Sequence, residues 1–253
     1  MRWMHLRLEA LMASFGGEAI DNRGVIRNFP AQSMVTGLFA NALGWTRWMR
    51  SEHQRLQDRI LFGAVHDADP DTLRMTDYQT AQLRKADKGW TTRGRPLGRA
   101  GGANTYPTHQ RWRDYHSDLR MSLVVQLNPE GEDPTLERLA AAMQRPVRPL
   151  FIGRKPCLPS TPLYAGNREA DSALAALIKT PVESDDALLD TDIRLLWQDG
   201  EASEQARAVN TYMLTDERNW RSGLHGGGRL VHEGTLPIDR FGNGESAQKE
   251  ERQ

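Results

Sequence analysis

The chain has 253 residues, enough for one large or two small domains with a hydrophobic core. Lysine plus arginine and aspartate plus glutamate both number 33, so the overall charge identifies no partner. The single cysteine, Cys157, excludes an internal disulfide bond and a zinc site built from several cysteines. No apolar run approaches the roughly 20 residues that span a bilayer, and the N-terminus lacks the apolar stretch of a signal peptide. We therefore expect a soluble, cytoplasmic protein.

The first elements follow the spacing of apolar residues. Residues 4–10 alternate with a period of two, which predicts a half-buried strand. After a loop, apolar residues at helical spacing predict a helix that begins at an N-cap, Ser33, and stops at Gly44. A second helix is expected to begin at Ser51, with Gln54 completing a capping box. The next stretch, FGAVHD, is expected to be a strand.

Two further predicted strands flank a long cationic segment. The strands are MTDYQTAQ and LRMSLVVQL, and between them KGWTTRGRPLGRAGGANTY contains five glycines and no acidic residue. This order predicts a long hairpin, or arm, that projects from a sheet. Residues 74–120 carry ten lysines and arginines against four aspartates. Such a concentration of cations in a neutral chain indicates a site for a polyanion.

The remaining elements complete an α+β pattern. TLERLAAAMQRP is expected to form a helix that starts at Thr135 and stops at Pro146. The first 150 residues are therefore compatible with a ferredoxin-like βαββαβ unit that carries an insertion. Residues 151–235 are expected to form a smaller, irregular part with a helix, SALAALIK, and two strands, IRLLWQ and NTYMLT. Residues 236–253 are expected to be a disordered tail.

The cationic arm also contains aromatic residues. They are Tyr78, Trp90, Tyr106, Trp112 and Tyr115. Arginine and lysine pair with phosphates while aromatic rings stack on bases, which contributes about 1–3 kcal/mol per stacked base. This combination predicts binding of single-stranded nucleic acid. The alternative is a surface loop whose aromatic residues pack into the core.

Two other segments have the composition of an anion site. Arg27 and the free backbone amides around Ser33 are expected to converge at the start of the first helix, where phosphate binds well. The segment HGGGR, which ends at Arg229, could cradle a phosphate, although it lacks the Gly-Lys-Ser/Thr of a P-loop. The alternatives are an ordinary capped helix and a glycine-rich turn between strands.

Two histidines of the arm suggest a different class of function. His109 and His116 lie seven residues apart and could act as general base and acid in a metal-independent ribonuclease. A metal site would need a third ligand and closer spacing. Exposed or RNA-contacting histidines are the simpler interpretation.

Several motifs resemble those of a known family in their order and spacing. They are LRLEALMASFGG, RNFPAQSMVTGLFANALGW, TDYQTAQ, RWRDYHSDLRMSLVVQL and PLFIGRKPCLPSTPLYAG. Over about residues 4–234 the chain resembles the CasD subunits of type I-E CRISPR Cascade complexes, which belong to the RAMP superfamily.

This resemblance implies a ferredoxin-like, RRM-related domain with a β-hairpin thumb at about residues 78–116. It implies a subunit that holds the 5′ handle of the CRISPR RNA in an antiviral surveillance complex and contacts the backbone and large subunits. Target DNA would be met only through the complex, and no cofactor is expected. A non-catalytic role is implied, because another subunit cuts repeat RNA in type I-E systems. Some relatives in other subtypes cleave repeat RNA, so an endoribonuclease using Tyr115, His116, His109 and Lys155 is the alternative.

The resemblance also implies which residues contact RNA. Ser33 falls on the helix-start motif of the family, in which a lysine or arginine often precedes the serine. Gln32 stands there in this chain, so Arg23 and Arg27 are expected to supply the positive charge. The expected RNA contacts are Arg23, Arg27, Ser33, Arg93, Arg95, Arg99, Arg111, Arg113, Arg154 and Lys155. No catalytic residue and no metal ligand is expected.

Overall fold

The computed structural model describes residues 1–18, 21–67, 74–82, 89–90, 96–97, 108–182, 192–202 and 208–242. The elements are β1 (Arg2–Ala13), β2 (Arg23–Gly24), α1 (Gln32–Ala42), α2 (Arg50–Arg59), β3 (Ile60–His66), β4 (Arg74–Gln82), β5 (Gly89–Trp90), β6 (Pro96–Leu97), β7 (Thr108–Leu127), α3 (Leu136–Gln144), β8 (Tyr164–Glu169), α4 (Ala173–Ile178), β9 (Asp192–Gln198), β10 (Ala208–Leu214), β11 (Arg229–Pro237) and the 3₁₀ helix η2 (Ile238–Arg240).

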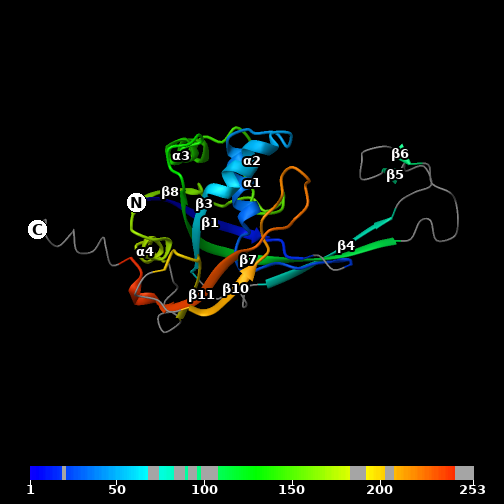
Figure 1. Cartoon of the computed structure of the whole chain (residues 1–253). Helices are drawn as coiled ribbons and strands as arrows, with labels where there is room; N and C mark the ends of the chain where they lie inside the picture. The colour runs from blue at the N-terminus through cyan, green and yellow to red at the C-terminus, as the bar shows by residue number, and fades with distance from the viewer. Residues whose placement is uncertain are drawn as a thin grey trace, which may run out of the picture.

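A large sheet forms the centre of the protein (Figure 1). Its strand order is β10-β11-β9-β3-β7-β1-β8, and β2 and β4 also pair with β7. All neighbours along this order are antiparallel, whereas β2 runs parallel to β7. The first strand lies inside the sheet, because Met4 faces Val125 of β7 on one side and Asn167 of β8 on the other. The chain is therefore a mixed α/β protein with a large antiparallel sheet.

Helices cover both faces of this sheet. The helices α1, α2 and α3 lie over one face and α4 lies against the other (Figure 1). The first core contains Leu6, Phe39, Leu56, Leu123 and Leu139. The second core contains Trp3, Val65, Val124, Leu177 and Trp197. Because neighbouring strand residues point to opposite faces, β1 and β7 supply side chains to both cores. Each large side chain buried in this way contributes about 1.5–3 kcal/mol.

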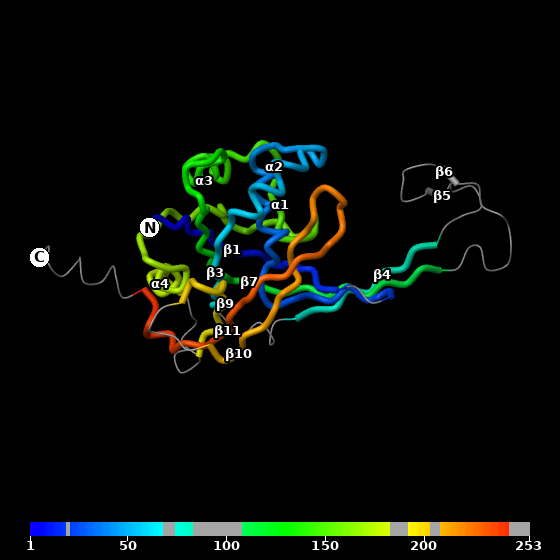
Figure 2. Tube along the Cα trace, viewed as in Figure 1, coloured from blue at the N-terminus to red at the C-terminus, as the bar shows by residue number. Residues whose placement is uncertain are grey.

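The strand β7 has 20 residues and extends beyond the body of the protein. Its residues 119–127 are almost all buried, whereas residues 108–111 are exposed. This outer part pairs with β4, with Arg74 opposite His116 and Gln82 opposite Thr108. Figures 1 and 2 show the two strands leading away from the sheet. The predicted pair of strands around the cationic segment is confirmed, and residues 83–88, 91–95 and 98–107 lie outside the described residues.

The start of α1 differs from the prediction. Its N-cap is Ala31, not Ser33, and no side chain of the neighbouring sequence caps it. Asp216, from the connection between β10 and β11, takes this role. Its Oδ2 accepts a hydrogen bond from the Gln32 amide at 2.9 Å, and its backbone oxygen accepts from the Ser33 amide at 3.1 Å. A cap so remote in the sequence leaves no local signal.

Of the other predicted helix ends, two are confirmed and one is wrong. Gly44 follows α1 with φ of +77°, as a helix stop requires. Thr135 caps α3, because its side chain accepts a hydrogen bond from the Arg138 amide at 3.3 Å. The predicted capping box of α2 is wrong. Its N-cap is Met49, and the Ser51 hydroxyl donates to Glu52 instead.

The second half of the chain extends the same sheet. The predicted α4, β9 and β10 are confirmed, but β11 was not predicted. The expected tail of residues 236–253 begins inside β11, and Phe241 is buried in the second core. Residues 236–242 are therefore folded, and residues 243–253 lie outside the described part. None of the helices in the described ranges is long and apolar enough to cross a membrane.

Candidate nucleic-acid interface

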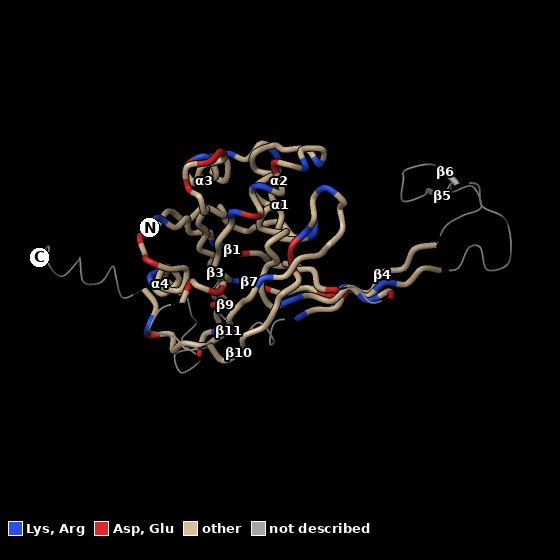
Figure 3. The backbone as a smooth tube through the Cα atoms, in the orientation of Figure 1, with Lys and Arg blue, Asp and Glu red and all other residues tan. Residues whose placement is uncertain are grey.

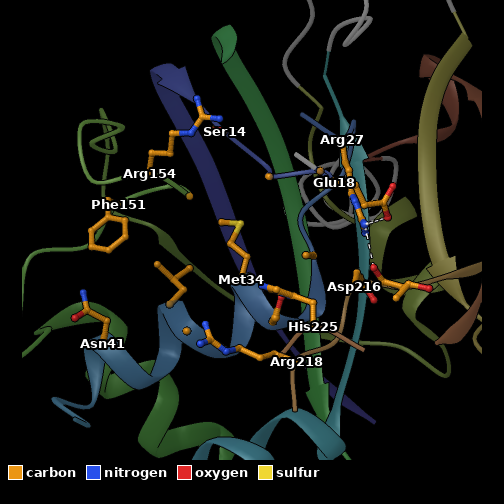
Figure 4. Close-up of a pocket in the computed structure, with 18 of the residues that line it drawn as sticks. Ser14, Glu18, Arg27, Met34, Asn41, Phe151, Arg154, Asp216, Arg218 and His225 are labelled. Atoms are coloured by element: carbon orange, nitrogen blue, oxygen red, sulfur yellow. Dashed lines mark hydrogen bonds and ion pairs between the residues drawn. The ribbon is translucent and has the colours of Figure 1, made fainter. Parts of the chain in front are cut away.

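A cleft of about 790 Å³ lies along α1, from Ala31 to Asn41, next to the end of β1. Two loops close it, one at residues 151–154 and one formed by the connection between β10 and β11, residues 215–228. Figure 4 shows side chains from all of these segments arranged around it. The polar and charged side chains of the lining are Ser14, Glu18, Arg27, Ser33, Asn41, Arg154, Thr215, Asp216, Arg218 and His225.

Arg27 is held at one wall of this cleft. Its Nη2 donates to Glu18 Oε1 at 3.0 Å and to the Thr215 carbonyl oxygen at 2.9 Å (Figure 4). The Arg27 side chain is 21% exposed, whereas that of Glu18 is 81% exposed. An ion pair with so exposed a partner contributes little free energy. A phosphate could therefore replace Glu18 while the Thr215 carbonyl keeps the guanidinium in place.

The backbone amides at the start of α1 are already bonded. Asp216 accepts from the amides of Gln32 and Ser33, and the Met34 amide donates to the Ala31 carbonyl at 3.0 Å. The expectation of free amides around Ser33 is therefore wrong, because a phosphate would have to displace Asp216. The Ser33 side chain still lines the cleft.

Arg229 does not cradle a ligand. Its Nε and Nη2 donate to the two carboxylate oxygens of Asp216 at 3.0 and 2.8 Å, and both side chains are buried. The guanidinium also lies 4.6 Å from the centroid of the Phe62 ring. The HGGGR segment is therefore a turn between strands, in which Gly227 has φ of +95°.

Arg154 lies at the opposite wall of the cleft from Arg27 (Figure 4). Its two terminal nitrogens donate to the carbonyl oxygens of Asp114 and Gly24 at 3.2 and 3.3 Å, and its guanidinium lies 4.7 Å from the Tyr115 ring centroid. The preceding Gly153 has φ of +88°, and a Cβ there would lie 1.7 Å from the Ser14 carbonyl oxygen. Only glycine allows this approach, which brings Arg154 to the end of β1.

Two more of the expected arginines lie next to Arg154. A Cβ added to Gly24 would lie 2.9 Å from Nη2 of Arg154 and 3.3 Å from Nη1 of Arg113, so these guanidiniums flank the same glycine. Arg23 Nε lies 3.6 Å from Asp114 Oδ2, and its side chain is 62% exposed. The three guanidiniums lie near two carboxylates, Asp114, which pairs with Arg23, and Asp77, which stands opposite Arg113 in the ladder of β4 and β7. One positive charge of this group is therefore left over.

The remaining expected contacts lie elsewhere. Arg111 is exposed on the outer part of β7, where its Nη1 donates to the Gln110 carbonyl. Lys155 is exposed beside Arg154 but does not line the cleft. Arg93, Arg95 and Arg99 lie outside the described residues.

The two histidines considered for ribonuclease chemistry are not brought together. His116 is 2% exposed, its Nε2 shares a hydrogen bond of 2.8 Å with the Arg27 carbonyl, and its ring packs on Phe15. His109 is exposed on the same strand, and a separation of seven residues places the two side chains on opposite faces, roughly 23 Å apart. Tyr115 is buried beneath Arg154. Across the described ranges, no group of three or more His, Cys, Asp and Glu side chains is arranged to hold a metal.

The sequence did not reveal what holds the connection between β10 and β11, residues 215–228, against the cleft. The Gln57 side chain on α2 is buried, and its Oε1 accepts from the Arg218 amide at 3.1 Å and from Trp220 Nε1 at 2.9 Å. Its Nε2 donates to the Arg218 carbonyl at 3.1 Å. The Trp220 ring packs on His53 with centroids 4.6 Å apart. Both Arg218 and Trp220 line the cleft, so Gln57 positions them.

Replacing Gln57 by alanine is expected to loosen this loop. The backbone amide of Arg218 and the indole N–H of Trp220 would both lose their hydrogen-bond acceptor. Leaving a buried donor without a partner costs about 1–3 kcal/mol of stability. Hydrogen exchange of the Arg218 amide should accelerate by about 10-fold or more, since about 1.4 kcal/mol is a factor of ten. Gln144→Ala on the exposed face of α3 is the matched control and should leave this exchange rate unchanged. An unchanged rate in Gln57→Ala would show that other contacts hold the loop.

Comparisons with known proteins agree with this architecture. Residues 3–232 match the model of the family described as CRISPR-associated protein (Cas_Cas5). The chain is 24% identical over 190 residues to the CRISPR system Cascade subunit CasD of Escherichia coli (strain K12), covering 72% of this chain and 79% of that protein.

Two solved structures share the fold. One, a CRISPR RNA-guided surveillance complex, contains a chain with a TM-score of 0.66 and 19% identity, matched over 98% of this chain and 96% of that one. The other, a crystal structure of a Cas protein, gives a TM-score of 0.55 and 23% identity over 94% of this chain and 97% of that one. Because the family model spans nearly the whole chain, the protein belongs to the Cas5 family of CRISPR-associated proteins.

Proposed function

We propose that the chain is a non-catalytic, RNA-binding subunit of a cytoplasmic surveillance complex of the Cascade type, in which it holds the 5′ handle of the guide RNA. The observation that carries this proposal is the cleft between Arg27 and Arg154, which continues to Arg113 and Arg23 on the adjoining strands. Similarity to CasD and to a chain of an RNA-guided complex supports the choice of ligand.

The two arginines at the cleft are suited to a phosphate backbone. Backbone carbonyls of Thr215, Asp114 and Gly24 fix their guanidiniums, so little side-chain freedom is lost on binding. Arginine forms strong charge-assisted hydrogen bonds with phosphate oxygens. The cleft volume of about 790 Å³ falls within the roughly 300–1,000 Å³ of ordinary ligand sites, which suits a short single-stranded segment.

The proposal includes the finer features of the fold. The order β8-β1-β7-β3, with α1 and α2 between β1 and β3 and α3 between β7 and β8, supports a ferredoxin-like, RRM-related βαββαβ unit of the RAMP type. The ladder of β4 with the outer part of β7 would form the base of the thumb. Arg111 would lie over the RNA or against the neighbouring backbone subunit, together with the arginines at 93, 95 and 99. The large subunit would be a further partner.

Replacing Arg27 and Arg154 together by alanine tests the RNA site. We expect the affinity of the purified chain for handle RNA to fall about 10- to 100-fold, because two charge-assisted hydrogen bonds to phosphate are lost. The slope of log affinity against log salt should also become shallower by about 0.7 for each lost phosphate contact. Fluorescence anisotropy with labelled RNA measures both quantities.

The matched control replaces Arg55 and Arg138 by alanine. These are two exposed arginines paired with Glu132 and Asp133. It removes the same charge and should leave the affinity nearly unchanged. An equal loss in both double variants would show that only overall charge matters, against the proposed site. Specific cleavage of repeat RNA in EDTA that disappears in His116→Ala would overturn the non-catalytic assignment.

A further inference from the structure

Trp48 lies in the connection between α1 and α2 and is unusually exposed. Its side chain is 65% exposed, although tryptophan is highly buried on average. The guanidinium of Arg47 lies 4.4 Å from its ring centroid, and that of Arg50 lies 5.8 Å away. The connection therefore presents an aromatic ring together with two cations to solvent.

The positive charge of this surface is not neutralised by neighbouring acids. Arg47, Arg50 and Arg221 are exposed, and none of them pairs with a carboxylate in the part of the chain that the structure describes. Three other exposed arginines, Arg2, Arg55 and Arg138, pair with Glu137, Glu132 and Asp133, whereas the exposed Arg145 has no such pair among the described residues. What distinguishes Arg47 and Arg50 is that both lie against the exposed ring of Trp48.

The position of two of these cations does not stabilise the local fold. Arg50 is the first residue of α2, and Arg47 lies just before it. Positive charge at a helix N-terminus opposes the helix dipole and costs about 0.3–1 kcal/mol. The first turn contains a single acid, Glu52. A binding role accounts for cations that the helix itself does not favour.

This surface adjoins the cleft. Arg50 Nη1 donates to the Arg221 carbonyl oxygen at 3.0 Å. Arg221 belongs to the same connection, residues 215–228, that supplies Arg218 and Trp220 to the lining of the cleft. Figure 3 shows basic segments at the start of α2 and at the tip of this connection beside it. A single-stranded nucleic acid that leaves the cleft on this side would pass over Trp48.

We propose that Arg47, Trp48, Arg50 and Arg221 form a second contact for single-stranded nucleic acid, in which a base stacks on Trp48 and phosphates bind the arginines. The proposal rests on the proposed function, because the strand is the one held in the cleft. A stacking ring combined with arginines, whose planar donors match phosphate, is the chemistry of single-strand binding. An acidic protein segment would use the charges but would not require a solvent-exposed ring.

The dependence of affinity on RNA length tests this second contact. The full chain is titrated with labelled single-stranded RNAs of about 4 to about 16 nucleotides, the range of single-strand sites. Trp48→Ala should leave the affinity for the shortest bound RNA unchanged. It should weaken binding of the longer RNAs by about 5- to 150-fold, the equivalent of about 1–3 kcal/mol for one stacked base. Trp48→Phe retains a ring and should restore most of that loss.

The intrinsic fluorescence of the ring gives a second measurement that does not need a folded alanine variant. Longer RNA should quench the emission of the wild-type chain more than that of Trp48→Phe, whereas the shortest RNA should quench both equally. Equal affinity of Trp48→Ala and wild type for long RNA, or equal quenching, would overturn the second contact while leaving the cleft intact. Loss of a protein partner from Trp48→Ala with unchanged RNA binding would assign this surface to protein instead. If the wild-type chain binds none of these RNAs, whatever their length, the proposed function itself fails.

Discussion

Replacing Asp216 by alanine is expected to lower the free energy of unfolding by about 3–5 kcal/mol, the cost of leaving a buried charge without its partner. The stranded charge is Arg229, whose side chain is only 8% exposed and whose two hydrogen bonds to the Asp216 carboxylate would be lost. The Gln32 amide at the start of α1 would lose its acceptor as well. Urea unfolding followed by circular dichroism measures the change.

Two controls separate the buried charge from a general effect of mutation. The double variant Asp216→Leu with Arg229→Met removes both charges and should recover most of the lost stability. Asp133→Ala removes the partner of the exposed Arg138 and should cost no more than about 1 kcal/mol. A double variant as unstable as Asp216→Ala would show that the ion pair is not the source of the effect.

Mild acid is expected to destabilise the protein through two buried histidines. Burial, with smaller contributions from Arg168 and Arg7, lowers the pKa of His5 from 6.5 to about 4. Burial lowers the pKa of His66 to about 3, although a hydrogen bond with the Asn28 carbonyl opposes this shift. Below pH 6.5 the unfolded chain takes up protons on both imidazoles, whereas the folded chain keeps them neutral. Their contribution to stability is therefore complete above pH 6.5 and is lost as the pH falls towards 4 and 3.

The free energy of unfolding should be lower at pH 5 than at pH 7.5 by about 2 kcal/mol for each histidine. The pKa of Glu217 is raised by burial and acts in the opposite direction, so the comparison is made between variants. His5→Gln with His66→Gln should reduce the pH dependence. Titration of the histidine ring protons by NMR measures the two pKa values directly, and values near 6.5 would contradict the prediction.

The fold was predictable where the signal was local. Alternation identified β1 and the inner part of β7 because each strand faces a helical core, and Gly44 and Thr135 marked helix ends through their own backbone and side chain. The start of α1 was not predictable, since its cap, Asp216, lies 184 residues from Gln32. Glycines before β11 and Gly234 within it interrupted the pattern of that strand.

The candidate site was predictable only where its residues stand in recognisable sequence motifs. Arg27 was identified by its place before the first helix and Arg154 by a motif that resembles a family, and both line the cleft. Ser33 was placed at the right helix end, but Asp216 already bonds its backbone amide. Gln57 could not be recognised, because a glutamine in a polar helix is usually exposed and only its burial reveals its bonds to Arg218 and Trp220.

The place of β1 inside the sheet affects how the protein can be made. β1 is synthesised before both of its neighbours, β7 and β8, so Met4 can pair with Val125 only once β7 has been made and with Asn167 only once β8 has been made. At about 5–20 residues per second, ribosomes need roughly 10–30 s to complete this stretch. Meanwhile both edges of β1 lack their partner strands, and unpaired strand edges favour aggregation. The central sheet is therefore completed only after most of the chain has left the ribosome, and any subunit that recognises the folded sheet can join only after that point.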